Sequence, residues 1–290
     1  MIHQGRESAT PRRGERVPAR PLADTLERVS EIETAGYPIE LTARLGLPDE
    51  PGWTVASDLY RDRLGGVLDR AGRSLGLGNR AYTGTSVLRD CLWRLLTPVV
   101  AAFLTERRLP DLAAANVGLR FGEGGFTEGL AFVGPRFHCL PEDPEAGHPD
   151  AVVLGSTDRL VDRARVALSE THVAALVPAL RERGVRRGTR ALERAAADVC
   201  AEAFIFVGRG LGREAEGAEA AGRLLGGTSR ISAPVNYRVL AYPGGSEATR
   251  VRNTCCLYYK TGNGVCFTCP RKTDEERVRQ LVAESSEGGA

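Results

Sequence analysis

The sequence lacks a long hydrophobic run. The longest, residues 92–104, has thirteen residues and is interrupted by Arg94, whereas about 20 apolar residues are needed to cross a bilayer. The first twenty residues contain arginines but no apolar stretch behind them, so neither a secretory nor a twin-arginine signal is expected. We therefore expect a cytoplasmic protein with no transmembrane segment.

An excess of charge of one sign is also lacking. Thirty-nine Lys and Arg residues face thirty-seven Asp and Glu residues, which leaves a formal net charge of +2. Nucleic-acid-binding domains usually carry a marked basic excess, so no nucleic-acid partner is expected. The hydrophobic content of 42% is enough for a real core.

Several binding motifs are missing as well. There is no P-loop, and the glycine run at 208–212 follows a predicted helix and lacks the G-x-G-x-x-G spacing of a nicotinamide site. His138, His148 and His172 lack the i, i+4 spacing of helical metal ligands. We expect no second metal site from them.

Apolar spacing predicts a mainly helical α+β fold. Residues three or four apart form apolar stripes that predict helices beginning near Leu22, at 58–77, from Ser86 onward, at 160–180, 192–207 and 275–283. Pro98 is expected to kink or divide the third of these helices. Short apolar or alternating runs at 116–121, 130–133, 151–154 and 235–242 predict a small antiparallel sheet, with residues 135–150 as a loop. The first two runs are separated by Gly122, Gly124 and Gly125 and are predicted to form a hairpin with a glycine-rich loop.

These elements divide the chain into four regions. Residues 1–20 are predicted to be a disordered arm and residues 284–290 a disordered tail. Residues 21–233 form the main helical and sheet domain, and residues 234–283 form a cysteine-rich C-terminal subdomain.

Four of the seven cysteines lie within fifteen residues: Cys255, Cys256, Cys266 and Cys269. The odd total argues against a simple disulfide framework, and in a reducing cytosol clustered thiolates favour metal binding. The pattern is C-C-x9-C-x2-C, and two cysteines three apart can bend around one metal ion. The Asn263-Gly264 pair between the halves favours a chain reversal that brings them together.

The spacing alone leaves two kinds of site open. Four thiolates can hold a structural zinc ion. Adjacent cysteines in an extended chain point to opposite faces, so Cys255 and Cys256 must lie in a bend or serve two different metal atoms. A binuclear iron–sulfur cluster accepts such a pair more easily than one tetrahedral ion.

The segment from Cys255 to Cys269 resembles the C-terminal [2Fe–2S] motif of the FhuF-like ferric-siderophore reductases, with Tyr258 and Tyr259 after the cysteine pair. That family usually has ten residues between the pair and the CxxC, and this chain has nine. The segments 92–98, 116–121 and 172–177 are similar to the family's middle region in order and spacing, so the likeness covers about residues 80–271.

The resemblance implies a [2Fe–2S] cluster on the four cysteines and release of iron by one-electron reduction of Fe(III) in a ferric siderophore of the hydroxamate type. It implies that residues 21–233 dock the siderophore. Candidate contacts are His172 and, near the cysteines, the cations Arg252 and Lys260; the sequence favours plain solvation of the two cations and a structural role for His172 as the alternatives. Because no flavin or nicotinamide motif is present, the electron donor would be a separate ferredoxin- or flavin-type protein.

Two other functions remain open from the sequence. The same motif would serve an iron–sulfur electron-transfer or reductase protein in a biosynthetic pathway, and a zinc-binding module would need no redox chemistry. Cys91 and Cys200 lie in apolar helical surroundings and are expected to be inert core residues.

Overall fold

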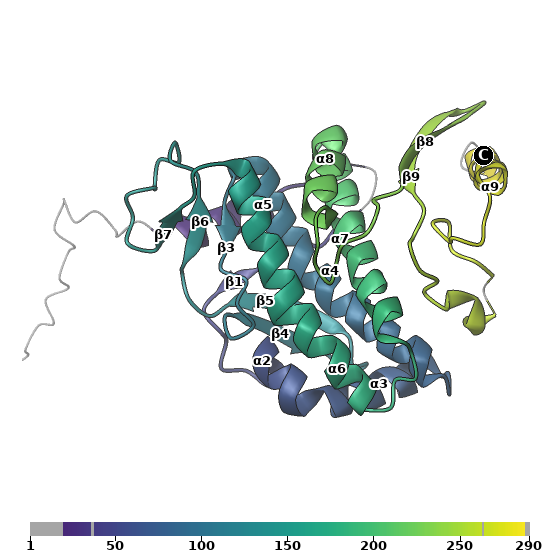
Figure 1. Ribbon diagram of the computed structural model, residues 1–290, viewed down its shortest axis with the longest axis horizontal. Helices are drawn as coiled ribbons and strands as arrows, with labels where there is room; N and C mark the ends of the chain where they lie inside the picture. Colours follow the sequence, from purple (N-terminus) through teal and green to yellow (C-terminus); the bar gives the residue numbers. More distant parts are fainter. Residues whose placement is uncertain (1–19, 36–37, 263, 288–290) are drawn as a thin grey trace, which may run out of the picture.

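The computed structural model describes residues 20–35, 38–262 and 264–287, so the predicted arm 1–20 lies outside the described residues except for Arg20. The fold is α+β, as predicted, with a helical scaffold, small sheets on one side and a C-terminal part on the other (Figure 1). The helices are α1 Pro21–Ser30, α2 Ala56–Asp58, α3 Leu64–Leu75, α4 Arg80–Glu106, α5 Thr157–Val166, α6 Ala174–Glu182, α7 Thr189–Gly210, α8 Glu214–Leu225 and α9 Asp274–Glu287. The strands are β1 Arg44–Leu45, β2 Trp53–Val55, β3 Leu109–Pro110, β4 Val117–Phe121, β5 Thr127–Phe132, β6 Phe137–Cys139, β7 Ala151–Val153, β8 Tyr237–Tyr242 and β9 Gly245–Arg250.

Helices α4 and α7 form the centre of the scaffold and pack against each other (Figure 1). Both bury long apolar faces, which is why their stripes are visible in the sequence. Helix α4 begins at Arg80, where the Asn79 side chain accepts a hydrogen bond from the Tyr82 amide, and therefore starts before Ser86. It continues through Pro98 without being divided, because tertiary packing on a buried helix outweighs one lost backbone hydrogen bond.

Two helical regions contain a π-helical turn. Residues Leu59–Arg63 join α2 to α3, and Ala167–Val173 join α5 to α6. The first region ends where predicted, at Gly76, whose φ of 62° gives the left-handed C-cap that glycine favours. Helix α8 follows α7 after a short turn.

The sheets confirm the predicted hairpin but are not purely antiparallel. Strands β4 and β5 pair antiparallel around the predicted glycine-rich loop. However, β1 pairs with β5 in parallel, and β6 pairs with β7 in parallel. Strand β6 also lies inside residues 135–150, which were predicted to be a loop. A hairpin is encoded by neighbouring residues, whereas these parallel partners come from distant or irregular segments that have no local signature.

The buried members of the main hydrophobic core run from Leu22 to Ile231, so the predicted boundary at 233/234 falls just after the last of them. The following residues form a β8–β9 hairpin that leads into the cysteine segment and then into α9 (Figure 1). Helix α9 reaches Glu287, past the predicted end at 283 and into the predicted tail. Among the described residues, no helix combines the length and apolarity that a membrane span needs.

Candidate metal centre and adjoining pocket

The four predicted ligands lie in the segment between β9 and α9. Cys256 Sγ and Cys266 Sγ are 3.8 Å apart, and Cys255 Sγ accepts a hydrogen bond from the Leu257 amide at 3.4 Å. Cys269 is buried, and none of the four forms a disulfide among the described residues. The backbone bends at Leu257, whose φ is 67°, directly after the adjacent cysteines. The chain therefore turns where the cysteine pair requires it.

The CxxC half forms the turn that its spacing predicts. The Cys269 amide donates to the Cys266 carbonyl at 3.1 Å. From α9, the buried Arg277 donates to the Phe267 carbonyl at 3.0 Å and to the Cys269 carbonyl at 2.5 Å. Helix α9 thus holds this turn from one side, a contact that the sequence did not reveal.

The structure brings together two of the four predicted ligands. Within the described ranges, no group of three or more His, Cys, Asp or Glu side chains is placed to hold one metal ion. The chemistry of the donors nevertheless suits an anionic iron–sulfur cluster, since amide and guanidinium N–H groups point at the sulfurs. The four-cysteine site and its cofactor remain predictions.

Hydrogen bonding and charge favour a thiolate at the Cys256–Cys266 pair. The hydrogen bond from Cys266 lowers the pKa of Cys256 to about 5, with Arg252 adding a favourable charge against the opposing effect of burial. The same hydrogen bond, together with burial, raises the pKa of Cys266. The pair therefore holds one proton between two sulfurs and offers a thiolate near neutral pH.

A buried charge network fastens this segment to the helical scaffold. Asp198 and Glu202, one turn apart on α7, are 0% and 2% exposed. Arg250 Nη2 lies 2.6 Å from Asp198 Oδ1, and Arg252 Nε lies 2.6 Å from Glu202 Oε1. Arg89 of α4 adds a third contact, 2.7 Å from Glu202 Oε2. Carboxylates this deep are stable only when paired in this way.

Asp198 also holds the backbone that leads into the cysteines. Its carboxylate accepts hydrogen bonds from the Asn253 amide at 2.7 Å and the Thr254 amide at 3.1 Å. Arg187 donates to Thr254 Oγ1 at 3.0 Å and to the Cys255 carbonyl. The position of Cys255 is therefore set by residues from outside its own segment.

Glu202 acts on the sulfurs through Arg252. Burial alone would raise the pKa of Glu202, but Arg89, Arg252 and Arg250 outweigh it and lower the pKa to about 2. The ionised Glu202 fixes Arg252, whose Nη1 then donates to Cys266 Sγ at 3.3 Å. Glu202, Arg252 and Cys266 thus form a row of charged contacts that links α7 to the cysteine segment.

A pocket of about 300 Å³ opens beside this sulfur pair. Its lining consists of the two sulfur-bearing residues, residues from the first turns of α4, and two residues of the cysteine segment: Cys256, Cys266, Tyr82, Ser86, Arg89, Arg252 and Tyr258. The walls present two guanidinium groups and hydroxyl donors next to the sulfurs. An oxygen-rich or anionic small molecule fits that chemistry.

The three candidate substrate contacts are in different environments. Arg252 lines the pocket, and Lys260 is exposed with Nζ 5.4 Å from the centre of the Tyr259 ring. His172 is fully buried: Tyr60 donates to its Nδ1 at 2.7 Å, and its Nε2 donates to the Leu112 carbonyl at 2.8 Å. These contacts give His172 a structural environment, the alternative that the sequence favoured for it.

The sequence reading missed Asp198, Glu202 and Arg89. A usable signal was present, because the two acids interrupt an otherwise apolar stretch at 195–207 with i, i+4 spacing. Acids inside a buried helical face need cationic partners, and Arg250 and Arg252 were available with matching spacing.

One further motif in the sequence has no catalytic geometry. Residues 72–76 read Gly-Arg-Ser-Leu-Gly and match G-x-S-x-G. A nucleophile elbow places its serine on a strand-to-helix turn, whereas Ser74 lies exposed in the last turn of α3. The match therefore does not mark a catalytic serine, and its last glycine is the C-cap of α3.

No family model matches this chain, and no curated protein matches it in sequence. The likeness to the FhuF-like reductases is accordingly still a prediction from the cysteine motif.

Two solved structures with partial similarity are aerobactin synthetases from a hypervirulent pathotype of Klebsiella pneumoniae. IucA aligns with a TM-score of 0.45 and 15% identity over 52% of this chain and 29% of the synthetase. IucC aligns with a TM-score of 0.43 and 13% identity over 60% of this chain and 32% of the synthetase. The chain spans about a third of each synthetase, and similarity at this level carries no argument about activity.

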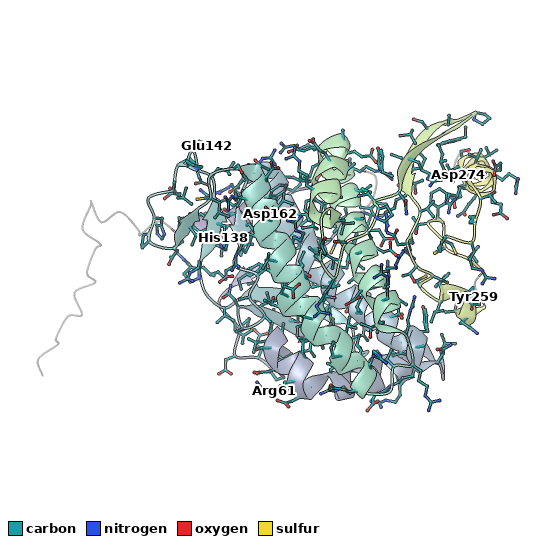
Figure 2. The ribbon with its side chains drawn as sticks, viewed as in Figure 1. Arg61, His138, Glu142, Asp162, Tyr259 and Asp274 are labelled. Carbon is teal, nitrogen blue, oxygen red and sulfur yellow. The ribbon has the colours of Figure 1, made fainter. Side chains whose placement is uncertain are left out.

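Replacing Asp198 with Asn should weaken the attachment of the cysteine segment. Arg250 would lose its closest counter-charge while staying buried, so we expect a loss of roughly 3 kcal/mol in the free energy of unfolding, measured with urea. Limited proteolysis should cut residues 251–273 faster than in the wild type. The control is Asp162→Asn on α5, whose half-exposed ion pair with Arg165 is worth less than about 1 kcal/mol (Figure 2). Equal losses in the two variants would contradict this role.

The protein should become less stable as the pH is lowered, because unfolding allows His172 to take up a proton. Burial lowers the pKa of His172 from 6.5 to about 4, so between these values the unfolded state binds a proton that the folded state does not. Stability attributable to this residue is therefore complete above about pH 6.5 and is lost as the pH falls to about 4, by about 3 kcal/mol in total. Urea unfolding across this range should show a flatter curve for His172→Gln, and parallel curves would refute the assignment.

Proposed function

We propose that this chain is a ferric-siderophore reductase that holds a [2Fe–2S] cluster on Cys255, Cys256, Cys266 and Cys269. The observation that carries the proposal is the pocket that opens directly on Cys256 and Cys266. It offers a small molecule a place in contact with the cysteines that would hold the cofactor.

The residues around the sulfurs fit the proposed cofactor. Arg252 and the Leu257 amide point N–H groups at Cys266 and Cys255, which would offset the negative charge of a thiolate-bound cluster. Such a cluster, when bound, supplies one electron at a time. The nearby cations would raise its reduction potential, and Tyr258 would limit the access of water.

The pocket chemistry supports an oxygen-rich iron complex as substrate. Hydroxamate oxygens are hard donors that hold Fe(III) far more tightly than Fe(II), so gain of one electron loosens the metal. Arg89, Arg252 and the Ser86 hydroxyl can donate hydrogen bonds to such oxygens. The volume of about 300 Å³ suits one face of a siderophore complex better than the whole of it.

The electron donor, on this proposal, is a separate ferredoxin- or flavin-type protein in the cytoplasm. The sequence carries no nicotinamide or flavin motif of its own. A biosynthetic electron carrier would use the same cysteines, but it would have no need for a small-molecule pocket with guanidinium and hydroxyl donors beside them.

Metal analysis tests the cofactor. Protein purified without oxygen should contain about two irons and two acid-labile sulfides per chain and absorb visible light. Cys266→Ser should lose the chromophore because one of four ligands is removed. Cys91→Ser is the matched control, since Cys91 is buried in α4 and should leave the spectrum unchanged. Colourless wild-type protein that contains zinc would refute the cluster.

Stopped-flow kinetics test the reaction. Dithionite-reduced protein should be reoxidised by a ferric trihydroxamate, and Ser86→Phe should raise the siderophore concentration for half-maximal rate by about tenfold, because the ring fills the pocket at a cost of about 1.4 kcal/mol in binding. Ser30→Phe, on the exposed end of α1, should match the wild type. Rates that are the same with and without siderophore would favour the biosynthetic carrier instead.

A further inference from the structure

Two segments of the chain carry several cations and no acid. Between Glu182 and Glu193 there are four arginines and no Asp or Glu, and between Glu247 and Asp274 there are five Lys or Arg residues and no Asp or Glu. The structure brings these two segments into contact, because Arg187 donates to the Cys255 carbonyl and to Thr254. Two basic segments thus meet at the cysteines, although the chain as a whole is nearly neutral.

Some of these cations are satisfied inside the molecule. Arg250 and Arg252 pair with the buried carboxylates of α7. Arg187 is half-buried against the cysteine segment, and Arg183 donates to the Ala179 carbonyl at 3.1 Å. Lys272 donates to the Gln280 side chain.

The remaining four cations face outward: Arg186, Arg190, Lys260 and Arg271, together called the basic surface. In the part of the chain that the structure describes, none of the four forms an ion pair. Helix α7 has no acidic residue in its first turn, although acids are the side chains that stabilise that end of a helix. Glu193, one turn further along α7, pairs with Arg230, so no described carboxylate pairs with Arg190.

Two of the four cations of the basic surface lie beside the ring of Tyr259. The Arg271 guanidinium lies 4.8 Å and the Lys260 ammonium 5.4 Å from the centre of its ring. Figure 2 shows Tyr259 at the outer edge of the molecule. Two cations are thus held beside one partly exposed aromatic ring, within the segment that carries all four cysteines.

We propose that the basic surface is the docking site for an acidic electron-donor protein, an inference that rests on the proposed function. Unpaired exposed cations repel one another in the free protein, and an acidic partner removes that repulsion on binding. Electrostatic steering raises the association rate of such pairs at low salt, which suits a transient redox encounter. The partner meets the outer side of the cysteine segment, while the pocket with Ser86 and Arg89 stays available to the substrate.

A protein fits better than the other anionic partners. The surface has only four cations, on two short segments that meet where Arg187 contacts Thr254 and Cys255, whereas duplex DNA favours a longer basic stripe that neutralises many phosphates. Membrane binding through charge requires an amphipathic helix or a denser basic cluster. The partly exposed Tyr259 ring adds apolar contact area of the kind common in protein interfaces.

Surface plasmon resonance with the cluster-loaded protein tests this surface. The probes are an acidic [2Fe–2S] ferredoxin and an acidic flavodoxin, each at about 20 mM and about 300 mM salt. At low salt, Arg186→Glu combined with Arg190→Glu should lower the association rate by about tenfold, and Arg271→Glu alone should also lower it. At high salt the differences should largely vanish. Arg186→Gln with Arg190→Gln should show a smaller loss of the same kind, which keeps the test valid if charge reversal disturbs folding.

Arg159→Glu on α5 is the matched control, because Arg159 is exposed, forms no ion pair among the described residues and lies outside the two basic segments. It should bind the probes within about twofold of the wild type. Absence of binding at low salt, an equal effect of Arg159→Glu, or stronger binding to anionic vesicles or duplex DNA would overturn the proposal.

A separate measurement distinguishes this proposal from the proposed function. The dithionite-reduced Arg186→Glu, Arg190→Glu variant should reduce a ferric trihydroxamate at the wild-type rate, since chemical reduction bypasses docking. If wild-type protein binds the acidic probes but does not react with the siderophore once it is reduced, the proposed reductase activity is refuted and the docking surface is supported.

Discussion

The arrangement of the candidate centre depends on two carboxylates buried on one helix. Asp198 and Glu202 lie inside α7, where an unpaired charge would be far too costly. Each must therefore be met by a cation. The cations are Arg250 at the end of β9 and Arg252 just after it, with Arg89 from α4 as the only other contributor among the described ion pairs. The need to neutralise these charges fixes where the end of β9 and the following residues can lie.

This constraint also sets the chemistry of the sulfurs. Because Glu202 holds Arg252, a guanidinium is kept against Cys266, and because Asp198 binds two backbone amides, Cys255 follows at a defined position. The C-terminal part contributes little apolar surface to the main core, whose buried members end at Ile231. Hydrogen bonds and ion pairs, in place of apolar packing, hold this part of the chain. They include the two hydrogen bonds that Arg277 of α9 donates to carbonyls of the CxxC turn.

The same segment presents two different surfaces. On the side of α4 it closes a pocket whose donors face the Cys256–Cys266 pair. Elsewhere it contacts residues 183–188 through Arg187, and together with those residues and the start of α7 it exposes cations that form no ion pair within the described part of the chain. A molecule that receives an electron from one protein and passes it to a small substrate needs two such surfaces close to one centre, so the geometry and the proposed reaction are mutually consistent.

Local patterns in the sequence determined the long helices, the β4–β5 hairpin and the turn of the CxxC pair, because helical periodicity, glycine turns and i, i+3 closure each depend only on neighbouring residues. The four-cysteine segment is also visible in the sequence, and the cluster predicted on it rests on the resemblance to the FhuF-like motif. Only the tertiary structure decided the parallel pairings of β1 and β6, the buried role of His172, the pairing of Arg250 and Arg252 with α7, and the meeting of two basic segments. These features join residues tens of positions apart, and their energy comes from desolvation and charge pairing in the folded interior, which no short stretch of sequence encodes.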